Sequence, residues 1–160
     1  MKSQSLDSRW ADIDEPLLRD LKGQVLPAPG KPVPVFTVAE QADGCRALGR
    51  FVESGKPAIA AKETSNYTTV YASTLALPSA FLRNCARKAG AFLYVESDES
   101  LQTDGHWLTI SATTGGKKEI HLPRPAIVRD ALGGESIGTN IDHWSVDMKP
   151  GETRIYEIQP

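Results

Sequence analysis

The sequence predicts an α+β protein in which a small sheet with one packed helix is followed by an antiparallel β-sandwich. Two observations lead to this fold class. A single stretch of helical periodicity lies between Pro78 and Gly90. After Val95 the chain consists of short candidate strands and turns. Strands that recur at intervals of roughly 8–12 residues are typical of a β-sandwich.

The helix is predicted from the spacing of its apolar residues, which form one stripe: Leu77, Phe81, Leu82, Cys85, Ala86 and Ala89. The opposite face carries polar residues: Arg83, Asn84, Arg87 and Lys88. Pro78 suits the first turn, where its missing N–H would have no partner in any case. Gly90 suits the left-handed position after the last turn. We interpret the cationic face as solvated surface rather than as a phosphate or nucleic-acid site.

Four strands are predicted before the helix, over residues 35–38, 47–53, 58–62 and 67–73. The last two are joined by a short turn at residues 63–66, so they should pair as antiparallel neighbours. After the helix, alternating or apolar runs predict strands over residues 106–111, 118–122, 126–130, 136–140, 144–148 and 153–158. A proline corner at residues 123–125 and turns at Gly133-Gly134 and Lys149-Pro150-Gly151-Glu152 separate them.

The first part of the chain is the least informative. Trp10, Ile13, Leu17, Leu18 and Leu21 predict a short amphipathic helix that Gly23 would end. Prolines then crowd into residues 27–34, as in a linker or an extended surface segment. We therefore predict three parts: an N-terminal segment and Pro-rich linker (1–34), a partial α/β domain (35–95) and an all-β sandwich domain (96–160).

Charge and composition argue against two classes of partner. The formal net charge is −2 and there is no long run of like charge, so neither a nucleic-acid binder nor a polybasic membrane anchor is expected. No stretch approaches the ~18 apolar residues of a membrane-spanning helix. The first residues contain no apolar signal-peptide core, which leaves localisation open.

The two cysteines, Cys45 and Cys85, allow two interpretations. Cys85 falls on the apolar stripe of the helix, which favours a buried free thiol. A Cys45–Cys85 disulfide is the alternative, although the spacing does not support it. Two thiols without further nearby ligands do not predict a zinc site.

Residues 48–160 resemble the C-terminal region of beta-galactosidase-type glycoside hydrolase-like proteins. One part of the resemblance lies in the segments Leu48-Gly49, Gly55-Lys56-Pro57, Ala60-Ala61-Lys62-Glu63, Val70-Tyr71, Leu77-Pro78, Leu82-Arg83, Ala89-Gly90 and Tyr94. These are similar to the end of the family's glutamine-amidotransferase-like α/β domain, which is related to the trimerisation domain. The other part, similar to the family's closing all-β domain, lies in Val128-Arg129-Asp130-Ala131-Leu132-Gly133-Gly134-Glu135, Trp144-Ser145-Val146-Asp147 and Pro150-Gly151-Glu152-Thr153-Arg154-Ile155-Tyr156.

The resemblance implies a non-catalytic accessory or structural domain of a carbohydrate-active protein, serving packing or oligomerisation. The family's catalytic carboxylates would lie in a barrel of roughly 250 residues, for which this chain has no room. No catalytic, cofactor-binding or metal-binding residue is therefore assigned. The expected partner is an upstream catalytic domain or a second copy of the chain, which would then be a detached tail, an excised piece or a reduced stand-alone relative.

The residues themselves offer little catalytic chemistry. Glu96, Asp98 and Glu99 are close in sequence, but we interpret them as a charged surface loop rather than as a glycosidase pair or a calcium loop. His106, His121 and His143 lack the spacing of a metal site. A hydrolase with an unrecognised site remains a weaker alternative.

Aromatic residues provide the alternative binding function. Trp107, Trp144 and Tyr67 are the candidate glycan-binding residues, because exposed rings stack on the apolar faces of sugars. Burial of both tryptophans in the sandwich core is the competing interpretation. An exposed aromatic row would favour a carbohydrate-binding module, and buried rings would favour a scaffold. Asn66-Tyr67-Thr68 also fits the N-glycosylation pattern, which arises often by chance.

Overall fold

The structure is a computed structural model that describes residues 6–28, 36–39, 44–73 and 77–159. The chain divides into two compact units, Met1–Ala89 and Gly90–Pro160, here called the N-terminal unit and the C-terminal unit. Each unit has a hydrophobic core of its own, and the two cores share no residue. The domain limits predicted at residues 34 and 95 stay predictions, because spatial division alone does not show which parts fold independently.

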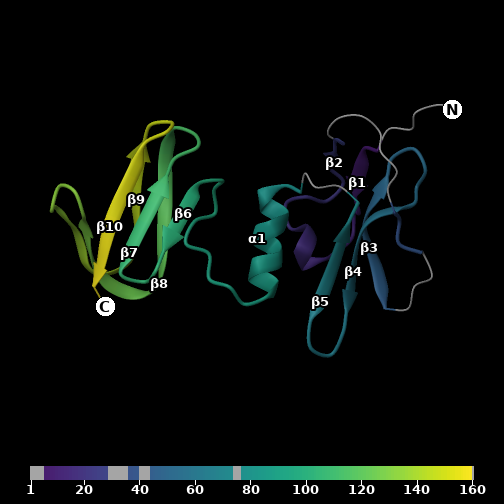
Figure 1. Ribbon diagram of the computed structural model, residues 1–160, viewed down its shortest axis with the longest axis horizontal. Helices are drawn as coiled ribbons and strands as arrows, with labels where there is room; N and C mark the ends of the chain where they lie inside the picture. The colour runs from purple at the N-terminus through teal and green to yellow at the C-terminus, as the bar shows by residue number, and fades with distance from the viewer. Residues whose placement is uncertain (1–5, 29–35, 40–43, 74–76, 160) are drawn as a thin grey trace. The chain divides into compact units, whose positions relative to one another are not determined.

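In its described residues, the N-terminal unit is a five-stranded antiparallel sheet with one α-helix and one 3₁₀ helix (Figure 1). In chain order its elements are β1 (Ser8–Trp10), η1 (Pro16–Leu18), β2 (Val25–Leu26), β3 (Cys45–Phe51), β4 (Pro57–Glu63), β5 (Thr68–Ala72) and α1 (Ser79–Lys88). The strands lie in the order β2-β1-β3-β4-β5. The predicted antiparallel pairing of the two strands around residues 63–66 is confirmed as β4 and β5.

The predicted helix over residues 10–21 is wrong. Trp10 instead ends β1, whose residues pair with Phe51, Arg50 and Gly49 of β3. Pro16 then begins the short helix η1, since a proline inside a longer helix would remove a hydrogen bond and clash with the preceding turn. The apolar residues of this segment lie in the core of the N-terminal unit, apart from the more exposed Ile13.

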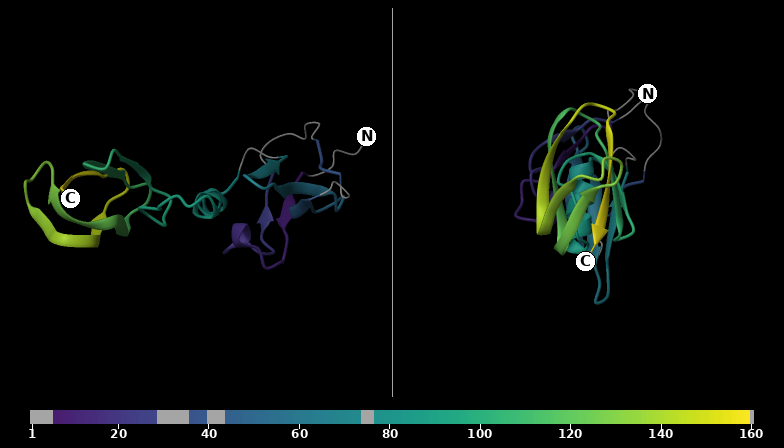
Figure 2. Two further views of the ribbon diagram at one scale, coloured as in Figure 1. Left: turned by 90° about the horizontal axis from the view of Figure 1, so that it is seen from below. Right: turned by 90° about the vertical axis from the view of Figure 1, so that its left-hand side faces the viewer.

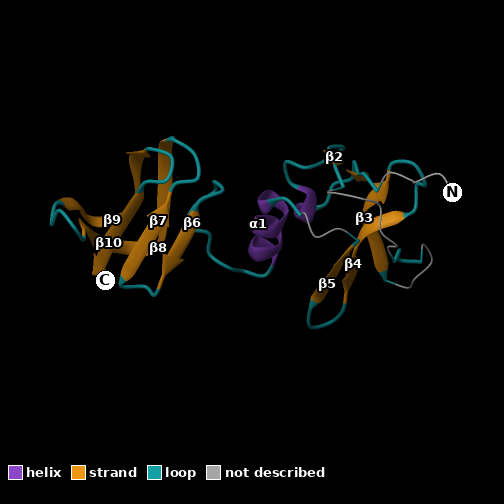
Figure 3. Cartoon of the chain, turned by 45° about the horizontal axis from the view of Figure 1, so that its top comes forward, coloured by secondary structure: helices purple, strands orange, loops and turns teal. Residues whose placement is uncertain are grey.

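Helix α1 has the predicted limits, and it packs beside η1 (Figure 3). Phe81 is buried and its ring stacks on that of Trp10 at a centroid distance of 4.9 Å. Three residues of the predicted stripe pattern are corrected. Leu82 and Ala89 are exposed, and Asn84 is buried, where its side-chain amide donates to the backbone carbonyls of Leu17 and Arg19.

The C-terminal unit contains five antiparallel strands: β6 (Ser100–Thr103), β7 (Trp107–Ser111), β8 (Gly116–Asp130), β9 (Ser136–Met148) and β10 (Thr153–Gln159). They form one sheet in the order β6-β7-β10-β8-β9. The two strands predicted at residues 136–140 and 144–148 are a single long strand, β9. Residues 36–38, predicted as part of a strand, form none, and residue 35 lies outside the described residues.

This sheet folds over itself and gives the sandwich-like unit that the sequence predicts (Figure 2). The first half of β8 pairs with β9, as in Ile120 opposite Trp144. The second half also pairs with β10, as in Val128 opposite Ile158. Between the halves the register shifts at Pro123-Arg124-Pro125, where two residues lack an N–H for a regular ladder. The resulting two layers enclose the core, and the α+β fold class is confirmed.

Candidate functional site

Of the three predicted glycan-binding residues, Trp107 lies at the start of β7 with 48% of its surface exposed. Its chain neighbours Leu108 and Ile110 on the opposite face are fully buried. The alternation therefore turns the indole of Trp107 to the outer face of the sheet. It is accessible to a ligand on that face.

Cross-strand pairing surrounds Trp107 with polar groups. Glu157 of β10 lies opposite Trp107, and Arg129 of β8 lies opposite Glu157, so the three side chains form one row on the outer face. The amide of Gln159 donates to the Glu157 carboxylate at 2.9 Å. An aromatic ring beside a carboxylate and a guanidinium provides one stacking surface with donors and acceptors for hydroxyl groups.

Trp144 has a different environment from Trp107. Only 7% of its surface is exposed, and its ring packs edge-on against Tyr156 at a centroid distance of 5.1 Å. Trp144 lies on the inner side of β9, in the core of the C-terminal unit. The core interpretation thus applies to Trp144, which has no surface for a sugar, and it does not apply to Trp107.

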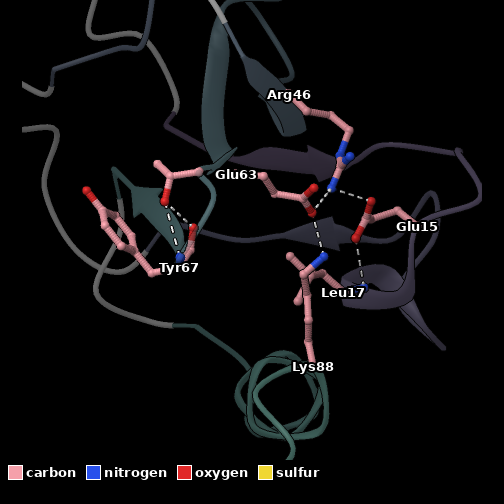
Figure 4. Close-up of polar contacts among 7 residues, drawn as sticks. Glu15, Leu17, Arg46, Glu63, Tyr67 and Lys88 are labelled. Atoms are coloured by element: carbon pink, nitrogen blue, oxygen red, sulfur yellow. Dashed lines mark hydrogen bonds and ion pairs between the residues drawn. The ribbon is translucent and has the colours of Figure 1, made fainter.

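Tyr67 belongs to the N-terminal unit, and 65% of its surface is exposed. It ends the turn between β4 and β5. The Tyr67 N–H donates to the Thr64 hydroxyl at 3.1 Å, and that hydroxyl donates to the Tyr67 carbonyl at 2.9 Å (Figure 4). Tyr67 and Trp107 lie in different units, so the structure does not bring the candidate aromatics together into one described row.

The loop of Glu96, Asp98 and Glu99 is exposed only in part, which corrects the prediction for Glu99. The side chains of Glu99 and Lys118 are 2% and 5% exposed and form an ion pair. Burial by itself would raise the pKa of Glu99, but hydrogen bonds from Lys118 and from the Thr113 N–H outweigh it and hold this pKa below its usual value. Glu99 is therefore an ionised, structural group rather than a proton donor.

A second charge cluster, which the sequence analysis missed, joins four segments of the N-terminal unit (Figure 4). Arg46 of β3 contacts the buried Glu15 at 2.6 Å and Glu63 of β4 at 3.4 Å. Lys88 of α1 contacts Glu63 at 2.6 Å. Hydrogen bonding and charge from Lys88, followed by the charge of Arg46, lower the pKa of Glu63.

This cluster holds helix and sheet together rather than forming an acid–base pair. Glu15 also accepts from the Leu17 N–H at 3.3 Å, which fixes the start of η1. The four charged residues of the cluster come from segments far apart in the chain, so no local sequence pattern could have predicted the cluster. The predicted solvated cationic face of α1 is corrected at Lys88, whose ammonium group binds Glu63.

Histidine and cysteine side chains form no recognisable metal centre in the described segments. His121 and His143 face each other across β8 and β9 with ring centroids 6.3 Å apart. The Nδ1 atom of His143 forms a hydrogen bond of 2.8 Å with the Oδ1 atom of Asp142. Within the described residues, no three His, Cys, Asp or Glu side chains converge as metal ligands. Cys45 and Cys85 are both free and half-buried, and burial raises the pKa of the Cys85 thiol.

In the described part of the chain, α1 is too short to cross a membrane and no other helix is long and apolar enough to do so.

The fold has similarity to solved structures but not to a known family model. No protein-family model and no curated protein matches the sequence. The fold is similar to part of the crystal structure of a cold-adapted beta-galactosidase from Rahnella sp. R3, with a TM-score of 0.49 and 13% sequence identity. That alignment covers 94% of this chain and 22% of the beta-galactosidase chain. The chain thus spans about a fifth of the length of the protein that it matches.

Proposed function

We propose that the chain is a non-catalytic accessory domain of a carbohydrate-active, glycoside hydrolase-like protein, where it serves packing or oligomerisation. The proposal rests on the sequence resemblance of residues 48–160 to the end of such proteins. An accessory role is also consistent with carboxylates that form ion pairs inside the fold. Examples are Glu63 and Glu99, which pair with Lys88 and Lys118.

The observation that supports the non-catalytic role is the direction in which hydrogen bonds and nearby charges shift the pKa values of the carboxyl groups. Seven described carboxyl groups have a shifted pKa, and in every one it is lowered: Glu63, Glu99, Asp104, Glu119, Asp130, Asp142 and Glu152. The groups that lower these pKa values most are lysine or arginine side chains, backbone N–H groups and, at Asp142, the His143 ring. A glycosidase needs one carboxylic acid that keeps its proton near neutral pH, which requires a raised pKa. The surroundings of these seven groups lower the pKa instead, which favours the ionised carboxylate.

The test is to incubate the purified chain with aryl-galactosides, aryl-glucosides and natural oligosaccharides, with an active beta-galactosidase as the positive control. We expect no turnover. Turnover that survives repurification and is lost in a folded Glu96→Ala/Asp98→Ala or Glu63→Gln variant would contradict the proposal. Glu99 is left in place in these variants, because its buried ion pair would confuse a loss of activity with a loss of folding.

A second function, glycan binding, is favoured by the exposed ring of Trp107 with Glu157 and Arg129 in the same row. Sugar rings that stack on an exposed tryptophan change its fluorescence, and Trp10 and Trp144 are both buried. The test is a titration with soluble oligosaccharides and a pull-down on insoluble polysaccharides. If this function is correct, Trp107→Ala abolishes binding and the buried substitution Trp144→Phe retains it. Equal binding by the wild type and Trp107→Ala would exclude the site.

A further inference from the structure

Strand β5 ends the sheet of the N-terminal unit and pairs with β4 on one side only. Backbone hydrogen bonds outside the ladder show which of its groups face β4. The Ser73 N–H donates to the Ala58 carbonyl at 3.0 Å, and the Thr64 N–H donates to the Tyr67 carbonyl at 2.9 Å. Because hydrogen-bonded positions alternate along an antiparallel pair, Thr69 and Tyr71 also face β4.

The N–H and C=O groups of Thr68, Val70 and Ala72 therefore point away from β4, to the open edge. Among the described residues, no backbone hydrogen bond reaches these six groups. A row of unpaired donors and acceptors at strand spacing is a template for another strand. The occupant that fits the edge is an extended backbone, since only an extended strand presents matching groups at the same repeat.

Strand β5 also lacks three of the features that usually block an open edge, namely charged residues, proline and a bulge. Its sequence, Thr68-Thr69-Val70-Tyr71-Ala72, contains no charge and no proline, and its pairing with β4 has no bulge. A groove of about 630 Å³ lies between the β4–β5 turn and α1, and its lining includes Thr68 and Val70 of β5 and Cys85 and Lys88 of α1. An added strand would have room there for a side chain near Thr68 and Val70.

We propose that β5 pairs with β5 of a second copy of this chain, antiparallel and about a two-fold axis at Val70. In this register Val70 lies opposite Val70 of the second copy, and Thr68 lies opposite its Ala72. All outward groups then match, giving six inter-strand hydrogen bonds and one continuous sheet across both copies. Opposed positions carry no charge, so the edge is complementary to itself, as a two-fold interface requires.

The pairing is tested by cross-linking. Opposed residues of a hydrogen-bonded antiparallel pair have Cα atoms about 5.5 Å apart, within the range that a disulfide can bridge. Under mild oxidation, the Val70→Cys variant should therefore form a disulfide between the substituted positions of two chains. Thr69→Cys is the matched control, because Thr69 lies opposite Tyr71 of the second copy, and its own counterpart is out of reach. Peptide mapping distinguishes these bridges from the native thiols Cys45 and Cys85.

A second variant removes the pairing without cross-linking. Thr68→Pro deletes an outward N–H and leaves the β4 ladder intact, as proline is tolerated on an edge strand in that orientation. Light scattering should give twice the 17.4 kDa chain mass for the wild type and one chain mass for Thr68→Pro, with unchanged circular dichroism.

Any of these results would overturn the proposal: a wild-type monomer at high concentration, equal cross-linking of Val70→Cys and Thr69→Cys, or a folded Thr68→Pro variant that stays dimeric. Capture of a different protein through Val70→Cys, with no bridge between copies, would also reject the second copy as the occupant. The proposal does not depend on the carbohydrate-related function, which is tested by separate measurements.

Discussion

In the C-terminal unit, Lys118 is a single residue on which we expect the stability of the fold to depend. It lies on the inner side of β8, where its ammonium group donates to Glu99 and, at 3.2 Å, to the Thr114 hydroxyl. Glu99 in turn accepts from the Thr113 N–H. The pair thus connects the segment before β6 to the turn between β7 and β8. Removing one partner of a buried pair leaves the other charge without compensation.

We expect Lys118→Met to lower the free energy of unfolding by about 3 kcal/mol at pH 7. Lys117→Met is the matched control, because Lys117 is 62% exposed and its pairing with Glu119 lies at the surface, where an ion pair contributes little. Denaturant unfolding of the three proteins measures both effects. Equal losses in the two variants would show that the Glu99–Lys118 pair has no special role.

The difference in stability between the wild type and Lys118→Met should depend on pH, and the sign of this dependence can be derived. The pKa of Glu99 is lowered in the folded protein, so its contribution is fully present above the unfolded value of about 4.3 and is lost as pH falls through the folded value. In Lys118→Met, burial without the cation favours the protonated acid. The stability difference between the wild type and Lys118→Met should therefore shrink between pH 7 and pH 3. A difference that is constant over this range would contradict the assignment.

At the scale of elements, local signals predicted helix α1 well. Pro78 and Gly90 marked its limits, and Phe81 was placed correctly in the core. The position of Asn84 could not be predicted, because its burial depends on carbonyl groups of Leu17 and Arg19, far away in the sequence. Helical periodicity also misled for residues 10–21, where Pro16 was the local signal against a continuous helix.

Phe81→Ala should cost about 3–5 kcal/mol, the usual range for truncating a buried phenylalanine. The ring is 1% exposed and stacks on Trp10, which in turn belongs to β1, so its removal leaves a cavity between helix and sheet. Leu82→Ala on the same helix is the control, because Leu82 is 55% exposed. Thermal melting should show a large loss for Phe81→Ala and a small one for Leu82→Ala. The reverse order would mean that the helix presents another face to the sheet.

At the scale of the whole molecule, the sequence predicted which segments form helices or strands better than it predicted which strands pair with one another. Short alternating runs indicated the strands after Val95. Their order in space, β6-β7-β10-β8-β9, depends on long-range pairing that no local pattern encodes. The candidate site could not be predicted for the same reason. Trp107 is exposed and Trp144 is buried because of the face that each strand turns toward the core of the folded sheet. Both residues lie in strands with similar alternation, so sequence alone could not separate them.

The two separate cores lead to a prediction about cooperativity. One core is built around Phe81 and Trp10, and the other around Trp144 and Tyr156, with no residue in common. Two units that are stabilised by different residues should unfold in two transitions, and distant substitutions should act independently. Differential scanning calorimetry should therefore show Phe81→Ala lowering one transition and Trp144→Ala lowering the other. Each substitution should cost about 3–5 kcal/mol in its own unit. A single transition that both substitutions shift equally would show instead that the units fold as one cooperative body.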